Sequence, residues 1–179
     1  MPYDGSKPSE NALQQAIRIV NDSLACGRET TTNSMQERGE GIQIILLHVV
    51  EEIHIRIPNM YIGLRIMAGT PLKEYFKELY QEMSIEASKM LDDVKKRIES
   101  TIQTNSDNSS TKLSHLSVTP QVVIGNPAQV IIDIANNKQK VDLIIMGSTG
   151  LKGISKVRIL GSVSRHVCEN ATCPVMLVH

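Results

Sequence analysis

The segment Gly147–Ser162 most constrains the fold of this chain, because its glycine-rich, hydroxyl-bearing loop joins an apolar run to an amphipathic pattern. The apolar run, Val141–Met146, is typical of a strand buried on both faces of a parallel sheet. The helix after the loop is expected to begin near Ser162, which can cap it, and to carry Val163 and Val167 on one face. This strand-loop-helix unit predicts an α/β fold.

The same loop has the features of an anion-binding site. Glycines let backbone N–H groups approach a ligand closely, and the N-terminus of the next helix adds free N–H groups and a positive dipole end. No acidic residue lies between Gly147 and Arg165, so the local field favours anions. The alternative is a connection that only needs turns, since neither a Walker motif nor a dinucleotide fingerprint is present. The cationic residues in or beside the loop are Lys152, Lys156, Arg158 and Arg165.

Composition limits the class of protein. A length of 179 residues with 41% hydrophobic content suits a single domain spanning residues 1–179. Nineteen basic residues balance nineteen acidic ones and aromatic residues are scarce, which argues against a nucleic-acid partner. The three cysteines form no Cys-x-x-Cys pair, which is consistent with reduced thiols. Without an apolar membrane span or a signal-peptide pattern, a cytoplasmic protein with no membrane partner is predicted.

Helical and strand patterns alternate along the chain, which predicts an open parallel sheet with helices on both faces. Pro120 suggests that its strand lies at an edge of the sheet. The expected elements, in chain order, are a helix capped by Ser6 or Ser9 and reaching Leu24, the strand Ile42–Val50, a helix over Leu72–Ile98, the strand Val118–Ile124, a helix from Pro127 with Asn126 as its cap, the strand Val141–Met146, the helix from Ser162, and the strand Pro174–Val178.

The segment Glu51–Pro71 departs from this alternation because it is too apolar for an ordinary solvent-exposed loop. It could be buried within the subunit, cover a ligand cleft, or form an interface with a partner. Burial within the subunit is slightly favoured.

Several sequence blocks become informative when they are taken together. In chain order they are Tyr3–Leu13, Leu46–Glu51, Val123–Pro127, Asp142–Ser148, Gly161–Ser164 and Cys173–Val178. In this order they resemble the universal stress protein (UspA) family. The resemblance implies a five-stranded parallel sheet of order 3-2-1-4-5, as in adenine nucleotide α-hydrolases, and in one branch an ATP site at the carboxyl ends of the strands.

The resemblance to the ATP-binding branch assigns a role to eight residues. Mg²⁺ would be held mainly by phosphate oxygens, so no protein metal ligands are expected. ADP or AMP could take the place of ATP. The residues are Pro2 and Asp4 beside the adenosine, Val49 at the adenine edge, Gly147 and Gly150 near the ribose and phosphates, and Gly161, Ser162 and Val163 around the phosphate tail.

Two departures from the family pattern bear on these roles. Ten residues separate Gly150 from Gly161, where the ATP-binding pattern has nine, and the extra residue either bulges the loop or displaces the phosphate donors. Only Met1–Tyr3 stands where relatives carry a whole first strand, which would be the central one. The expectation is that the natural protein begins upstream of Met1 or that another segment takes the central position.

The leading functional hypothesis is an ATP-binding stress-response module that dimerises through Cys173–Val178 and acts by binding. Slow ATP hydrolysis is compatible with it, but no nucleophile stands beside a general base, so no catalytic residue is assigned. The rivals are a nucleotide-free interaction or chaperone-like module and an enzyme of the α-hydrolase group. His48 is expected to be a hydrogen-bonded core histidine and His166 a solvated helix residue.

Overall fold

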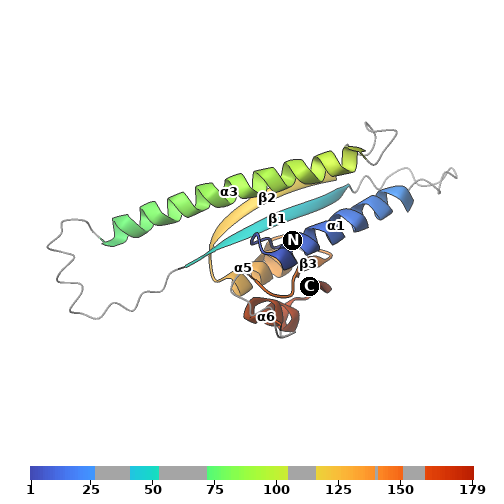
Figure 1. Cartoon of the computed structure of the whole chain (residues 1–179). Helices are drawn as coiled ribbons and strands as arrows, with labels where there is room; N and C mark the ends of the chain where they lie inside the picture. Colours follow the sequence, from blue (N-terminus) through green and yellow to red (C-terminus); the bar gives the residue numbers. More distant parts are fainter. Residues whose placement is uncertain (27–40, 53–71, 105–115, 140, 151–159) are drawn as a thin grey trace.

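The computed structural model describes residues 1–26, 41–52, 72–104, 116–139, 141–150 and 160–179. The roles considered for Glu51–Pro71 lie mostly outside these ranges. Helices and strands alternate as predicted, although the last two strands are shorter than expected (Figure 1). The elements are α1 (Lys7–Cys26), β1 (Ile42–Glu51), α3 (Leu72–Thr104), β2 (Leu116–Gly125), α5 (Pro127–Asp133), the π-helical turn η1 (Ile134–Lys138), β3 (Ile144–Gly147), α6 (Ser162–Asn170) and β4 (Val175–Val178).

The strands form two parallel pairs. β1 pairs with β2 along ten residues, from Ile42 opposite Leu116 onward, and β3 pairs with β4 along four. The chain start lies beside β1 through a single parallel bridge between Pro2 and Leu47, flanked by backbone hydrogen bonds of 2.8 and 2.9 Å. The described first residues therefore contribute one bridge rather than a strand. The order 3-2-1-4-5 stays a prediction, and both observed pairs agree with it.

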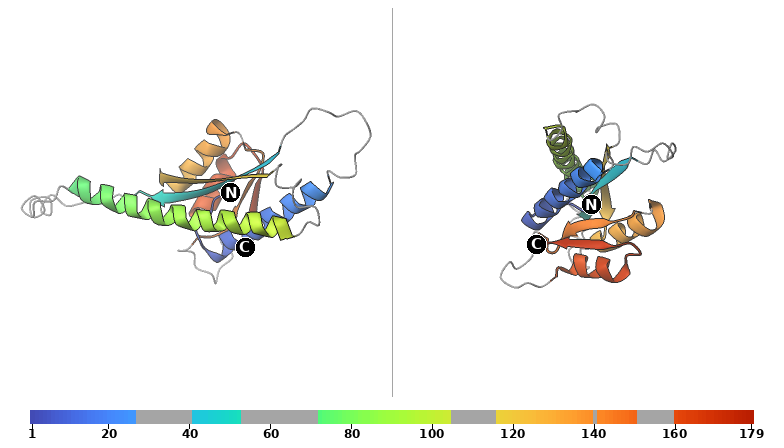
Figure 2. Two further views of the ribbon diagram at one scale, coloured as in Figure 1. Left: turned by 90° about the horizontal axis from the view of Figure 1, so that it is seen from above. Right: turned by 90° about the vertical axis from the view of Figure 1, so that its right-hand side faces the viewer.

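Helices cover both faces of the strands. Figure 2 shows α1 and α3 on one side and α5 and α6 on the other. Alternate side chains of β1 pack on opposite faces, because successive residues of a strand point in opposite directions. Ile44 and Leu46 pack with α1 and α3, whereas Leu47 packs with α5, β3 and α6. The predicted α/β architecture with helices on both faces is confirmed.

Two buried clusters hold these layers together. The first, called the α3 core, joins α1, β1, β2 and α3, and the second, called the α5 core, joins Leu47 of β1 to α5, η1, β3 and α6. The buried members of the α3 core are Tyr3, Leu13, Val20, Ile44, Leu46, Leu91, Val94, Ile98, Ile102 and Val118. The buried members of the α5 core are Leu47, Ile131, Ile132, Ile134, Ala135, Ile144, Met146 and Val167.

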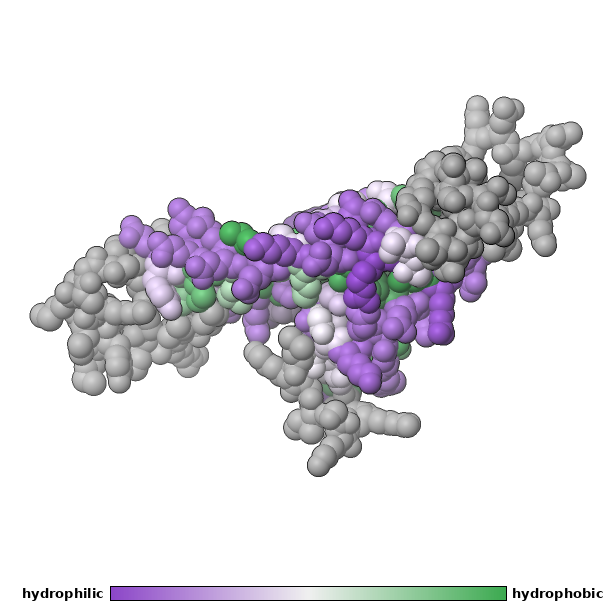
Figure 3. All heavy atoms as spheres, turned by 45° about the horizontal axis from the view of Figure 1, so that its top comes forward, coloured by the Kyte–Doolittle hydropathy of each residue, from purple (hydrophilic) through white to green (hydrophobic). Residues whose placement is uncertain are grey.

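Helix α3 is anchored by its C-terminal half. Leu91, Ile98 and Ile102 are fully buried there, whereas Tyr75 and Ile85 in the N-terminal half are 47% and 56% exposed. Figures 1 and 2 show the first turns of α3 extending beyond the strands, and Figure 3 shows the outer face of the helix as largely hydrophilic. A groove of about 850 Å³ lies under the N-terminal half. Its lining includes Phe76, Tyr80 and Ile124.

Local sequence signals set several helix starts. Asn126 caps α5 by accepting a hydrogen bond from the Gln129 backbone N–H at 3.1 Å, and Pro127 occupies the first helical position, as predicted. Ser6 rather than Ser9 caps α1, because its Oγ accepts from the Ser9 N–H at 3.3 Å. The prediction that Ser162 caps α6 is wrong: Gly161 is the N-cap and Ser162 is the first helical residue.

Candidate functional site

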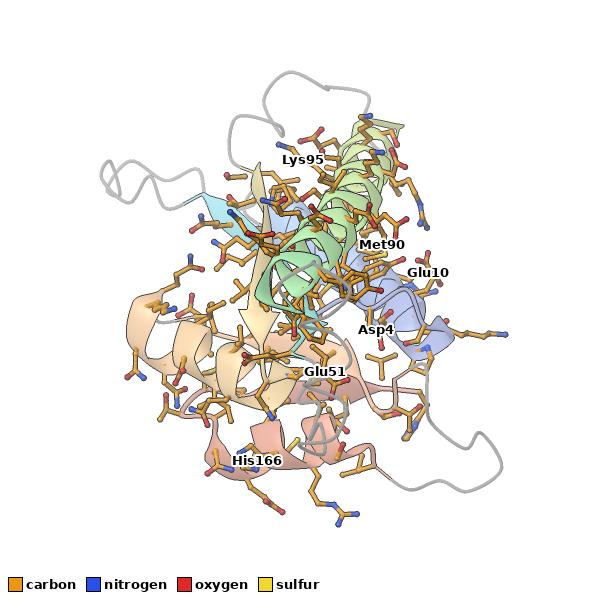
Figure 4. The ribbon with its side chains drawn as sticks, turned by 90° about the vertical axis from the view of Figure 1, so that its left-hand side faces the viewer. Asp4, Glu10, Glu51, Met90, Lys95 and His166 are labelled. Carbon is orange, nitrogen blue, oxygen red and sulfur yellow. The ribbon has the colours of Figure 1, made fainter. Side chains whose placement is uncertain are left out.

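A tight turn places the Asp4 carboxylate at the start of α1. Gly5 has a φ of 77°, a left-handed conformation that glycine adopts without strain. The Ser6 backbone N–H donates to Asp4 Oδ1 at 3.0 Å, so one carboxylate oxygen is held by the turn. In Figure 4, Asp4 lies at this turn, below Glu10 and Met90.

Two glycines bring the loop after β3 against this turn. A β-carbon added to Gly147 would lie 2.9 Å from the backbone of Pro8 and Ser9, closer than real β-carbons come. A β-carbon added to Gly150 would lie 2.9 Å from Asp4 Oδ2. The structure thus brings Gly150 to Asp4 and Gly147 to the start of α1. Gly147 requires a residue without a side chain because backbone atoms crowd it, whereas at Gly150 the Asp4 side chain could move aside.

The start of α6 has a helix N-terminus with no capping side chain. The Gly161 carbonyl accepts the first α-helical hydrogen bond from the Arg165 N–H at 3.0 Å, and Gly161 makes no side-chain cap. The backbone N–H groups of the first turn, from Ser162 and Val163, therefore suit an anionic ligand. The N-cap falls on Gly161 because its own N–H donates to the Ser148 carbonyl at 2.9 Å and turns the chain there.

Ser148 connects these parts and was assigned no role from the sequence. Its N–H donates to the Val178 carbonyl at 2.8 Å, and its carbonyl accepts from the Gly161 N–H and from Ser164 Oγ at 2.7 Å. Its hydroxyl lies 2.7 Å from Nδ1 of His179, and the residue is 1% exposed. The sequence signal that could have indicated Ser148 is its place in the motif Gly-Ser-Thr-Gly, residues 147–150. Nothing in the spacing of the sequence indicated His179.

The remaining predicted site residues lie nearby in the sheet and core. Pro2 bridges Leu47, and Val49 follows two residues further along β1. Val49 and Val163 are half-buried and pack against the α5 core, so their backbone groups rather than their side chains are the parts suited to a ligand. His48 Nδ1 lies 2.9 Å from the Tyr3 carbonyl oxygen, which confirms its hydrogen-bonded role.

An ion pair between Arg97 and Glu10 lies beside the site and stabilises the position of the chain start. Arg97 of α3 donates two hydrogen bonds to the Glu10 carboxylate, and Tyr3 Oη donates to Glu10 Oε2 at 2.9 Å. The hydrogen bonds from Arg97 lower the pKa of Glu10, and burial is the main cause that raises the pKa of Tyr3. This network joins α1, α3 and the residues leading to Asp4.

Of the four cationic residues that the sequence places in or beside the loop, the structure describes one. Arg165 lies exposed on α6, and the other three cations lie outside the described residues. Among the residues that the structure describes, no group of three or more His, Cys, Asp or Glu could hold a metal ion. In the same ranges, no helix has the length and apolar character needed to cross a membrane.

The family model of the universal stress protein family matches residues 1–179. The chain is 30% identical over 183 residues to universal stress protein YxiE of Bacillus subtilis, covering 98% of this chain and 93% of YxiE. It is 45% identical over 58 residues to universal stress protein MJ0531 of Methanocaldococcus jannaschii, which spans 32% of this chain and only 33% of MJ0531.

A solved structure has a similar fold. The structure of hypothetical protein MJ0577 covers 99% of this chain and 91% of its own, with a TM-score of 0.65 and 25% identity. The family model matches the whole chain, and YxiE aligns with it along nearly its full length. The chain therefore belongs to the universal stress protein family.

Proposed function

We propose that this protein binds an adenine nucleotide at the end of the strands where Asp4 meets the glycine loop, and acts as a dimeric regulatory module. The observation that carries the proposal is the 2.9 Å approach of a Gly150 β-carbon position to Asp4 Oδ2. Residues nearly 150 positions apart in the chain thus meet at the place where parallel α/β folds bind ligands.

In the proposed complex ATP takes a definite orientation. The first turn of α6 offers the backbone N–H groups of Ser162 and Val163 for the phosphates, because Gly161 already donates its own N–H to the Ser148 carbonyl. Asp4 has one carboxylate oxygen outside its turn hydrogen bond, which suits a ribose hydroxyl. Mg²⁺ supplies charge neutralisation of the phosphates when bound, and its ligands would be mainly phosphate oxygens.

The extra loop residue is compatible with this proposal because both described ends of the loop are fixed. Gly150 is held near Asp4, and Gly161 is tied to Ser148 by a backbone hydrogen bond of 2.9 Å. An added residue between two fixed ends can be accommodated outward at little entropic cost. The proposal therefore takes the ten-residue separation to be accommodated between these two ends.

A melting experiment tests the nucleotide. ATP with Mg²⁺ at 100 times its Kd is expected to stabilise the folded state by about 2.7 kcal/mol, which raises the melting temperature. Gly161→Val should remove this shift by placing a side chain over the phosphate donors. Ile85→Val, on exposed α3, is the matched control and should retain it. Calorimetry that detects no ATP, ADP or AMP binding at millimolar concentration would contradict the proposal and favour the nucleotide-free interaction module.

The proposed dimer uses the last strand. Within the described ranges β4 pairs only with β3, and Met176 is 38% exposed on it. An apolar strand edge invites pairing with a second copy related by a two-fold axis. Sedimentation should report a dimer that Met176→Lys weakens, while Glu169→Lys on α6 should leave it intact. A wild-type monomer at high micromolar concentration would overturn this part.

A further inference from the structure

His179 contacts the glycine loop from outside the proposed nucleotide site. Its Nδ1 lies 2.7 Å from Ser148 Oγ, and its backbone carbonyl accepts a hydrogen bond from Asn11 Nδ2 at 2.7 Å. Ser148 is fully buried whereas His179 is exposed. One residue thus links α1 to the first turn of the loop, where β3 ends.

Ser148 lies between the end of β3 and the start of α6 and contacts both. It follows Gly147 directly, and its carbonyl holds Gly161 at 2.9 Å and Ser164 Oγ at 2.7 Å. A buried hydroxyl that loses its partner either stays unsatisfied or rotates to find another one. The preceding residue, Gly147, packs so closely on α1 that an added β-carbon would lie 2.9 Å from backbone atoms of Pro8 and Ser9.

We propose that His179 is a positioning residue that sets the geometry of residues 147–150 and of the α6 N-terminus through the hydroxyl of Ser148. The effect of His179 on nucleotide affinity rests on the proposed nucleotide site. Its effect on the geometry of the backbone does not, because it exists in the protein without ligand. His179 does not touch the nucleotide in this arrangement. It raises affinity by keeping the loop in the binding-competent geometry, since a partly populated competent state weakens apparent binding in proportion.

The first test uses the ligand-free protein. Amide NMR shifts of Gly147, Gly150 and Gly161 should move in His179→Ala and stay near wild type in His179→Asn, because the asparagine side chain places a polar atom close to the Nδ1 position. His166→Ala is the matched control, since His166 is exposed on α6 (Figure 4). It should leave the three amide shifts unchanged. Unmoved amides in His179→Ala would overturn the proposal.

The second test measures the Kd of ATP with Mg²⁺ by calorimetry. His179→Ala should weaken binding roughly threefold to tenfold, the range expected for losing one hydrogen bond that fixes the loop. His179→Asn should recover most of the loss. The double variant Ser148→Ala/His179→Ala should bind no more weakly than the weaker single variant, because both changes remove the same contact.

The outcomes separate the two proposals. Equal losses in His179→Ala and His179→Asn, or fully additive losses in the double variant, would contradict positioning through Ser148. If the wild type binds no adenine nucleotide, the proposed function fails. The ligand-free amide shifts then still decide whether His179 positions the loop.

Discussion

The two strand pairs of the molecule are held together in different ways. β1 and β2 pair along ten residues each and are covered by α3, whose Leu91, Ile98 and Ile102 are fully buried. β3 and β4 pair along only four residues, and hydrogen bonds that converge on Ser148 hold the end of β3 to the start of α6 and to the end of β4. Apolar burial is non-directional, whereas hydrogen bonds fix particular atoms. We call the β1–β2 half, which is buried under α3, the apolar half. We call the β3–β4 half, where the hydrogen bonds of Ser148 add to the α5 core, the directed-contact half, and this is the half proposed to bind the ligand.

The largest effect is expected in the apolar half. Leu91→Ala should lower the free energy of unfolding by about 2–5 kcal/mol, because a fully buried leucine leaves a cavity. Ile85→Ala on the same helix should change it by less than about 0.5 kcal/mol, since its side chain is 56% exposed. Urea unfolding measures both. Similar losses for the two variants would show that α3 is not anchored by its C-terminal half.

The chain start should give a strong pH dependence. Burial lowers the pKa of the Met1 ammonium from 8.0 to about 5, and its nitrogen donates to the Ile45 carbonyl at 2.6 Å. Below pH 8 the unfolded chain binds a proton that the folded chain excludes. Stability should therefore fall by a few kcal/mol as pH drops from 8 to 5.

Acetylation of the Met1 nitrogen provides the control for that pH dependence. The acetylated chain cannot take up the proton, so its free energy of unfolding should vary much less between pH 8 and 5. Chemical denaturation at several pH values compares the two forms. Parallel curves for the free and acetylated chains would show that the ammonium is not excluded from the folded state.

Alanine substitutions at Gly147 and Gly161 should differ in their effect on stability, because the two residues are packed to different degrees. Gly147→Ala should destabilise the protein by about 1–3 kcal/mol, because its β-carbon meets backbone atoms of Pro8 and Ser9 at 2.9 Å. Gly161→Ala should cost less, since the nearest atom lies at an ordinary 3.4 Å. Thermal unfolding ranks the two variants. A reversed rank would contradict the close packing of β3 on α1.

The smallest effect belongs to the partly exposed ion pair. Glu10→Gln should lower stability at neutral pH by roughly 1 kcal/mol or less, because the Arg97 side chain is 56% exposed and solvent screens the pair. The pKa of Glu10 is lowered in the folded state, so its contribution is present above the unfolded pKa and is lost as pH falls through the folded value. Unfolding curves of both proteins should converge in acid. If the two unfolding curves stayed apart in acid, the loss of stability would not come from the Glu10 charge.

The helices and strands could be predicted well because their sequence signals are local and repeated. The helical spacing of α3 and the cap formed by Asn126 and Pro127 could be read directly. The site was predicted less completely. The resemblance supplied Asp4, Gly150 and Gly161, but the choice of Gly161 over Ser162 as N-cap depends on a hydrogen bond to Ser148. The link between Ser148 and His179 crosses 31 residues and leaves no periodic trace.

Hydrogen exchange with and without ATP and Mg²⁺ is the sharpest test of the proposed nucleotide site. We expect slower exchange of backbone amides in residues 147–150 and at the start of α6, with no change in residues 91–102 of α3. Control measurements with Gly161→Val should show no slowing at either place. Unchanged exchange around the glycine loop at saturating nucleotide, or slowing confined to the groove under α3, would contradict the claim that the directed-contact half is the nucleotide site.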